Sequence, residues 1–155
     1  MAETAPTALR IGVRFALSGE PGDLLADGRA VEAAGADSLW VDAADCDPYV
    51  LLAAFAATTW RATLVARGAA AGPGRATCAR LARGRLVIAE EEEARGERWI
   101  DVAFPNGRDE WRAARNAAVE AGATGLVIAN DPRLLDLLRN PDQIADRADM
   151  NLASG

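Results

Sequence analysis

The sequence predicts an α/β protein in which short strands alternate with helices and form one parallel sheet. Runs rich in β-branched and aromatic residues recur along the 155 residues, and glycine, proline or aspartate separates each from an amphipathic segment. Such alternation is typical of parallel sheets with crossover helices. We expect about six strands, whereas a complete eight-fold βα barrel takes about 250 residues. The chain is therefore predicted to be an open doubly wound sheet or a barrel that lacks some units.

The first half of the chain supplies two strand–helix units and a third strand. The expected elements are a strand at Leu9–Leu17, a helix capped by Asp23 and ended by Gly35, a strand at Ser38–Val41, a helix from Asp47-Pro48 and a strand at Ala62–Ala66. Leu24, Gly28 and Val31 share one face of the first helix, as a core-facing stripe would. Asp47 and Pro48 predict a helix start, because aspartate caps the first turn and proline fits the first helical position.

The second half continues the alternation. Its expected elements are a short helix at Arg75–Ala82, strands at Leu86–Ala89, Trp99–Phe104 and Leu126–Ala129, a helix at Asp109–Ala121, and a last helix over RLLDLL after Asp131-Pro132. Trp111, Ala114, Ala118 and Ala121 fall on one helical face. The run Glu90–Glu93 is expected to be a solvated strand end or loop, where carboxylates point to alternating faces and converge poorly on a cation. We therefore predict no metal site.

The composition excludes several kinds of chemistry. All seventeen basic residues are arginine, so lysine Schiff bases, histidine bases and histidine-containing metal sites are impossible. The net charge of −6 disfavours nucleic acid and anionic membranes, which bind through basic side chains. Cys46 and Cys78 lack a CxxC spacing, which indicates a reducing, cytoplasmic location.

The chain is expected to contain one domain, residues 9–155, preceded by a disordered tail, residues 1–8. The tail has neither the basic nor the apolar region of a signal peptide. The longest apolar run, Tyr49–Ala57, is much shorter than the roughly 20 residues that cross a bilayer. We therefore expect no membrane association.

Three segments follow one another in an order shared with a known family. They read LRIGVRFALSGEPGDLLADGRAVEAAGADSLWV, DPYVLLAAFAATTWRATLVARG and LARGRLVIA. Together they resemble the luciferase-like, flavin- or deazaflavin-dependent oxidoreductases. The part from Gly96 through NDPRLLDLLRNPD is similar to a tail of short members of that family. The resemblance implies an incomplete TIM-barrel-type fold, FMN or a deazaflavin coenzyme as cofactor, and dimers in which early helices pack together.

Chemistry in such folds is carried by residues just past the carboxyl ends of the strands. That rule selects five candidate cofactor-binding residues: Ser18, Asp42, Arg67, Asn106 and Asn130. Asp42 could accept a hydrogen bond from a flavin ring, and Arg67 could bind a phosphate bidentately. Helix capping, surface ion pairs and turn formation are the alternative roles. Family members carry a histidine after the second strand, whereas this chain reads Asp-Ala-Ala-Asp there, so we assign no catalytic residue.

The helix Pro48–Thr58 has almost no polar face. A helix on a protein surface needs one, so we expect this helix to join a homodimer or a hetero-oligomer.

Two candidate functions follow from the sequence. The first is a small luciferase-like oxidoreductase in which the flavin supplies the chemistry. The second is a non-catalytic scaffold or partner subunit of a full-length oxidoreductase. An unrelated flavodoxin-like domain is a third reading.

Overall fold

The computed structural model of the protein describes residues 8–44, 46–69 and 71–140. Most of the predicted tail, the last fifteen residues of the predicted domain and Asp45 lie outside them. The elements are β1 (Arg10–Phe15), α1 (Pro21–Ala33), β2 (Ser38–Asp42), α2 (Pro48–Thr58), β3 (Thr63–Arg67), α3 (Arg75–Ala82), β4 (Leu86–Ile88), α4 (Ala89–Ala94), β5 (Trp99–Val102), α5 (Arg108–Glu120), β6 (Gly125–Ala129) and α6 (Leu134–Arg139). Strict βα alternation is thus confirmed.

The strand order decides between the two predicted architectures. The described strands form one six-stranded sheet in the order β4-β3-β2-β1-β6-β5, and every pair is parallel. Strands that follow one another in sequence are neighbours in the sheet, except β4 and β5, and the last strand returns to lie beside the first. This is the cyclic order of a βα barrel, opened between β4 and β5. A flavodoxin-like order of 2-1-3-4-5 does not fit. The fold is therefore α/β with an incomplete barrel of six parallel strands.

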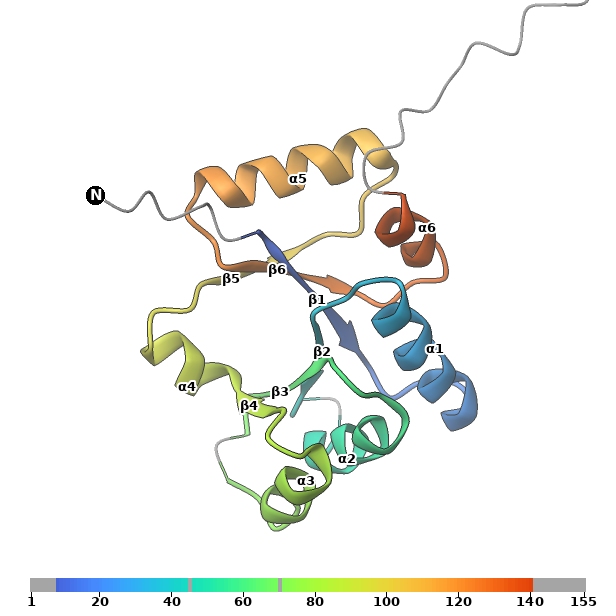
Figure 1. Cartoon of the computed structure of the whole chain (residues 1–155), viewed down its shortest axis with the longest axis vertical. Helices are drawn as coiled ribbons and strands as arrows, with labels where there is room; N and C mark the ends of the chain where they lie inside the picture. The colour runs from blue at the N-terminus through green and yellow to red at the C-terminus, as the bar shows by residue number, and fades with distance from the viewer. Residues whose placement is uncertain (1–7, 45, 70, 141–155) are drawn as a thin grey trace, which may run out of the picture.

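The helices lie on the outer side of the curved sheet. Figure 1 shows α5, α6, α1, α2 and α3 placed around the strands. Outward-facing strand residues pack against these helices in the main core, which contains Val13, Phe15, Leu39, Val41, Leu64, Ala66, Leu126 and Ile128. Alternate residues face the other way, and there Trp40, Val65 and Val127 form a second, smaller buried cluster. This two-sided burial explains the nearly continuous apolar runs of β2, β3 and β6.

Two glycines make room for two tryptophans on the inner face. A Cβ on Gly12 would lie 2.4 Å from the indole nitrogen of Trp40, and one on Gly125 would lie 2.4 Å from the ring of Trp99. The two indoles meet edge to face with their ring centroids 5.1 Å apart. Because Trp40 is in β2 and Trp99 is in β5, this contact crosses the interior of the open barrel. Two indoles therefore occupy part of the interior.

Three local expectations were wrong. The glutamate run lies in α4 and not in a strand end or loop, because glutamate favours helix and an acidic first turn suits the helix dipole. Helix α1 begins at Pro21, so Asp23 lies in its first turn and does not cap it. Strand β1 is shorter at both ends than Leu9–Leu17. The predicted cap of α2 is confirmed, since the N–H of Tyr49 donates to Asp47 Oδ1 at 3.0 Å.

None of the helices in the described residues has the length and apolar character needed to cross a membrane.

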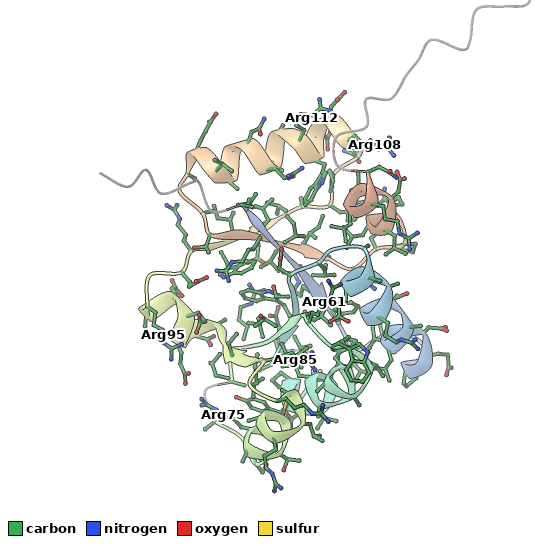
Figure 2. The ribbon with its side chains drawn as sticks, viewed as in Figure 1. Arg61, Arg75, Arg85, Arg95, Arg108 and Arg112 are labelled. Carbon is green, nitrogen blue, oxygen red and sulfur yellow. The ribbon has the colours of Figure 1, made fainter. Side chains whose placement is uncertain are left out.

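The buried Glu32 and the partly buried Arg85 hold the end of the barrel at which the strands begin. The carboxylate of Glu32, 7% exposed, accepts the backbone N–H groups of Trp60, Arg61 and Ala62 at 2.6–3.1 Å. Arg85 donates to carbonyl oxygens around the ends of α2 and α3, beside which it is labelled in Figure 2. Both side chains thus satisfy backbone groups that the helix ends and loops leave without partners.

Burial by itself would raise the pKa of Glu32. The three backbone hydrogen bonds and the charge of Arg61 outweigh it, so the pKa lies below the ordinary value of 4.5.

Replacement of Gly28 should destabilise the contact between α1 and α2. A Cβ at this position would lie 2.5 Å from the ring of Phe55, so we expect Gly28→Ala to lower the free energy of unfolding by about 1–3 kcal/mol. Gly22→Ala on the same helix is the control, because nothing lies within 4 Å of its Cβ position. Urea unfolding should show the loss for the first variant alone, and equal midpoints would contradict the packing described here.

Substitution of Glu32 should destabilise the loop after α2. We expect Glu32→Gln to cost about 1–3 kcal/mol near neutral pH, because an amide cannot accept all three backbone hydrogen bonds. The lowered pKa means that the carboxylate stabilises the fold above pH 4.5 and loses this effect as the pH falls through the folded-state value. The difference between wild type and Glu32→Gln in urea unfolding should therefore shrink in acid.

Exposed Glu93→Gln serves as the control and should change stability by less than about 0.5 kcal/mol. A wild-type advantage that stays the same at pH 7 and in acid would contradict the stabilising role of the carboxylate.

Candidate functional site

The candidate site is the mouth of the open barrel, where the strands end. In barrel enzymes the reacting groups gather at this end. Successive side chains of a strand face opposite sides of the sheet. At the mouth, those of Arg14, Asp42, Arg67 and Asp101 face the interior. They come from β1, β2, β3 and β5, so residues far apart in the sequence meet at one place.

These four side chains form one ion-pair network. Arg67 binds Asp42 through two hydrogen bonds, Nε to Oδ1 at 2.7 Å and Nη2 to Oδ2 at 3.0 Å. The same guanidinium donates to Asp101 from Nη1 at 2.8 Å and from Nη2 at 3.2 Å. Arg14 Nη1 also donates to Asp101, to Oδ1 at 2.9 Å, an oxygen that it shares with Arg67 Nη2. Two guanidiniums and two carboxylates thus balance in charge across the mouth.

The network joins strands that do not pair with each other. Strand β3 lies near one edge of the sheet and β5 forms the other edge, so the contact between Arg67 and Asp101 spans the opening. The hydrogen bonds that Arg67 donates to Asp42, together with those to Asp101, raise the pKa of Arg67 above its ordinary value. Arg67 is therefore a permanent cation that four hydrogen bonds already hold in place.

Guanidinium groups also lie over the interior indoles. The guanidinium carbon of Arg10 is 5.0 Å from the ring centroid of Trp99, and that of Arg67 is 5.5 Å from the ring centroid of Trp40. These are cation–π distances. Arg10 also pairs with Glu97. One face of each indole is thus covered by the protein itself.

A cleft of about 500 Å³ opens beside this network, on the side where the barrel is incomplete. Its lining includes both indoles, together with two guanidiniums, Arg67 and Arg98, and three carboxylates, Glu93, Glu97 and Asp101. The size is that of an ordinary small-molecule site. The excess of one carboxylate disfavours a phosphate.

Of the five predicted site residues, the structure brings together Asp42 and Arg67 alone. Ser18 is exposed in the loop after β1. The amide of Asn106 and its backbone N–H both donate to Glu110, which lowers the pKa of Glu110 and orders the start of α5. The amide of Asn130 donates to Asp27 at 2.9 Å, linking the end of β6 to α1. The contact of Asn106 corresponds to the capping role that was an alternative, whereas Asn130 makes a tertiary contact that neither capping nor turn formation describes.

Sequence reasoning missed Arg14, Asp101 and Trp99. A period of two along WIDV places Trp99 and Asp101 on one face of β5, and the same period in RIGVRF places Arg14 opposite the core. That signal was available in the sequence. What it could not reveal is that β5 lies across from β3.

The mouth as it stands does not fit a flavin. A flavin mononucleotide needs a flat slot for its ring and a free cation for its phosphate. Here four of the five N–H groups of Arg67 already serve carboxylates, and the cleft beside them is lined by three carboxylates. We therefore derive no chemical step through such a cofactor. In the described part of the chain, no three acidic, cysteine or histidine side chains converge as metal ligands would.

The apolar helix α2 is covered mainly by its own domain. It contacts α1, α3, β2 and β3, which explains most of its composition without a partner. Its outer side still carries Val50, which is 67% exposed, beside Leu17, which is 56% exposed. Between them and α1 lies an apolar groove of about 340 Å³.

Loss of the central cation should destabilise the mouth. Arg67→Met leaves two carboxylates without their main partner, and we expect the free energy of unfolding to fall by about 1–2 kcal/mol, because solvent screens the half-exposed Asp101. The control is Arg112→Met, whose pair with the fully exposed Asp109 should contribute less than about 0.5 kcal/mol. Equal losses in urea unfolding would show that the network is an ordinary surface ion pair.

Comparison with protein-family models finds no match to this chain, and comparison with curated proteins finds none either.

Proposed function

We propose that the chain is a shortened domain of the luciferase-like type that acts by packing against another protein subunit and not by catalysis. The observation that carries this proposal is the ion-pair network at the mouth. The inward-facing charged groups at the strand ends are bound to one another, so a reacting molecule meets neither an available base nor an available phosphate-binding arginine there.

The outer face supports the same proposal. The groove between α1 and α2 is apolar, and two large apolar side chains at its rim are more than half exposed. Exposed apolar clusters of this kind mark protein contacts. The subunit packed there would be a second copy of the chain or a full-length oxidoreductase, in line with the resemblance.

Flavin or deazaflavin binding is the second candidate function. One observation favours it: the cleft of about 500 Å³ is lined by the indoles of Trp40 and Trp99, and large apolar pockets with aromatic walls commonly bind flat ligands. The carboxylates in its lining argue against the phosphate of FMN. A cofactor bound there would have to be held mainly through its ring.

Titration with FMN and with a deazaflavin coenzyme separates the two candidates. We expect neither to quench tryptophan fluorescence in a saturable way, because carboxylates outnumber guanidiniums in the lining of the cleft and Arg67 is already paired. The measurement is sensitive, since Trp40 and Trp99 both line the cleft and a bound flavin would quench them. Free tryptophan in the same titration corrects for absorption by the flavin.

Saturable binding at micromolar concentration would overturn the non-catalytic proposal and favour a reduced flavoprotein. In that case Trp99→Phe should weaken the binding, and Trp111→Phe, a buried residue on α5, should not.

A further inference from the structure

Trp60 lies between two hollows on the outer surface, at the end of the barrel where the strands begin. The first hollow, of about 580 Å³, lies between Trp60 and the last turns of α1. The second, of about 470 Å³, lies between Trp60 and the end of α3, and Leu81, which is 50% exposed, lines it. Trp60 itself is 77% exposed, more than any other large apolar side chain in the described residues.

The two hollows are strongly basic, although the chain as a whole has a net charge of −6. Their lining contains five arginines, namely Arg29, Arg61, Arg80, Arg83 and Arg85. Among the described residues that line the hollows, the only carboxylate is that of Glu32, which is buried and already accepts backbone N–H groups. An exposed indole is thus surrounded by positive charge.

Four of these five guanidiniums are available to a ligand. Arg29, Arg61, Arg80 and Arg83 are exposed and make no salt bridge within residues 8–44, 46–69 and 71–140. They differ in this respect from Arg67 at the mouth, whose N–H groups already serve carboxylates. A guanidinium without a carboxylate partner can bind an anion through two parallel hydrogen bonds.

The loop that carries Trp60 is held in place from within the protein. The backbone N–H groups of Trp60 and Arg61 donate to Glu32 at 3.0 and 2.6 Å. Arg85, which Figure 2 labels, donates to the carbonyl oxygens of Thr59 and Ala62, both at 3.1 Å. A loop with a fixed conformation loses little freedom when a ligand binds, and a covered tryptophan buries about 150–250 Å². The indole is therefore a suitable anchor for another molecule.

We propose that this surface binds a short acidic peptide segment of another protein, with an apolar side chain of the segment packed against Trp60 and Leu81 and its carboxylates paired with the exposed arginines. Charge complementarity indicates an acidic ligand. The aliphatic side chain of Leu81 beside the indole suits an apolar amino-acid side chain. The contact lies outside the groove between α1 and α2 and is additional to the packing proposed above.

A nucleic acid fits the same surface less well. Its phosphates would pair with the arginines, and a base could stack on the indole. A nucleic-acid strand, however, carries negative charge along its whole length, so beyond the two hollows it would meet the field of a chain with a net charge of −6. A short peptide ends within the basic surface and avoids this repulsion.

A display library of random peptides, selected on the purified full chain, tests the proposal. We expect the enriched peptides to carry several aspartates or glutamates around at least one large apolar residue. Their binding should weaken as the salt concentration rises, because salt screens ion pairs between exposed groups. Enrichment of basic or wholly apolar peptides, or of no peptides, would overturn the proposal.

Variants of the chain test where an enriched peptide binds. We expect Trp60→Ala to raise the dissociation constant of the peptide at least about tenfold, as removal of a central anchor does. The double variant Arg29→Glu with Arg80→Glu, which reverses one charge in each hollow, should raise it by a similar factor. Fluorescence anisotropy of a labelled peptide measures both changes.

The matched controls lie on α5, outside both hollows. Val119→Ala removes another exposed apolar side chain, and Arg112→Glu with Arg115→Glu makes the same change in net charge. Each control should change the dissociation constant less than about twofold. Equal thermal unfolding midpoints show that a variant is folded. A loss of binding in the α5 double variant as large as that in Arg29→Glu with Arg80→Glu would overturn the proposal, because binding would then follow net charge alone.

Two further outcomes separate this proposal from its alternatives. Peptide binding that Val50→Arg abolishes and Trp60→Ala leaves unchanged would overturn the contact at Trp60, while it would support packing through the groove. Single-stranded oligothymidylate that displaces the peptide and binds more tightly would overturn the acidic peptide in favour of a nucleic acid. Failure of the peptide to bind would leave the proposed packing through the groove intact.

Discussion

The parallel pairing of β6 with β1 is the contact on which the rest of the structure depends. Five residue pairs join these strands, from Arg10 opposite Gly125 to Arg14 opposite Ala129. This pairing carries the C-terminal third of the chain back to the first strand and sets β5 across from β2 and β3. Both contacts that cross the interior, Trp40 with Trp99 and Arg67 with Asp101, exist because of it. Without it the sheet would have four strands and an open inner face.

The contacts that cross the interior change which groups at the barrel mouth are free to bind a ligand. In a catalytic barrel the strand ends present groups that are free to meet a substrate. Here the opening of the barrel between β4 and β5 leaves few strands to enclose a lumen. Two tryptophans and a neutral ion-pair network occupy part of it, beside the cleft of about 500 Å³. The charges that could act on a ligand stabilise the fold. The exposed apolar features lie instead on the outer side, where Trp60 follows α2 and an apolar groove lies between α1 and α2.

Part of the candidate site could be predicted from the sequence. The positions after β2 and β3 pointed to Asp42 and Arg67, because the ends of neighbouring parallel strands lie side by side. Asp101 and Arg14 could be assigned to the inner face by their period of two, yet their meeting with Arg67 depends on strand order. Asn106 and Asn130 were selected by the same rule, and the structure places Asn106 in a local hydrogen bond with Glu110 and Asn130 in a long-range one with Asp27. The position of a residue in the sequence shows at which end of the barrel it lies. The contacts of its side chain in the folded protein decide what it does there.

The sequence by itself determined the α/β class, the alternation of strands and helices, the capped start of α2 at Asp47 and the core stripe of α1. Those features depend on propensity, capping and periodicity, which act over a few residues. The tertiary structure decided the strand order, the burial of Glu32 under the loop after α2, and the covering of the apolar α2 by α1 and α3. These features depend on contacts between segments up to about a hundred residues apart. Local chemistry cannot specify such contacts, because many arrangements of the same elements satisfy it equally well.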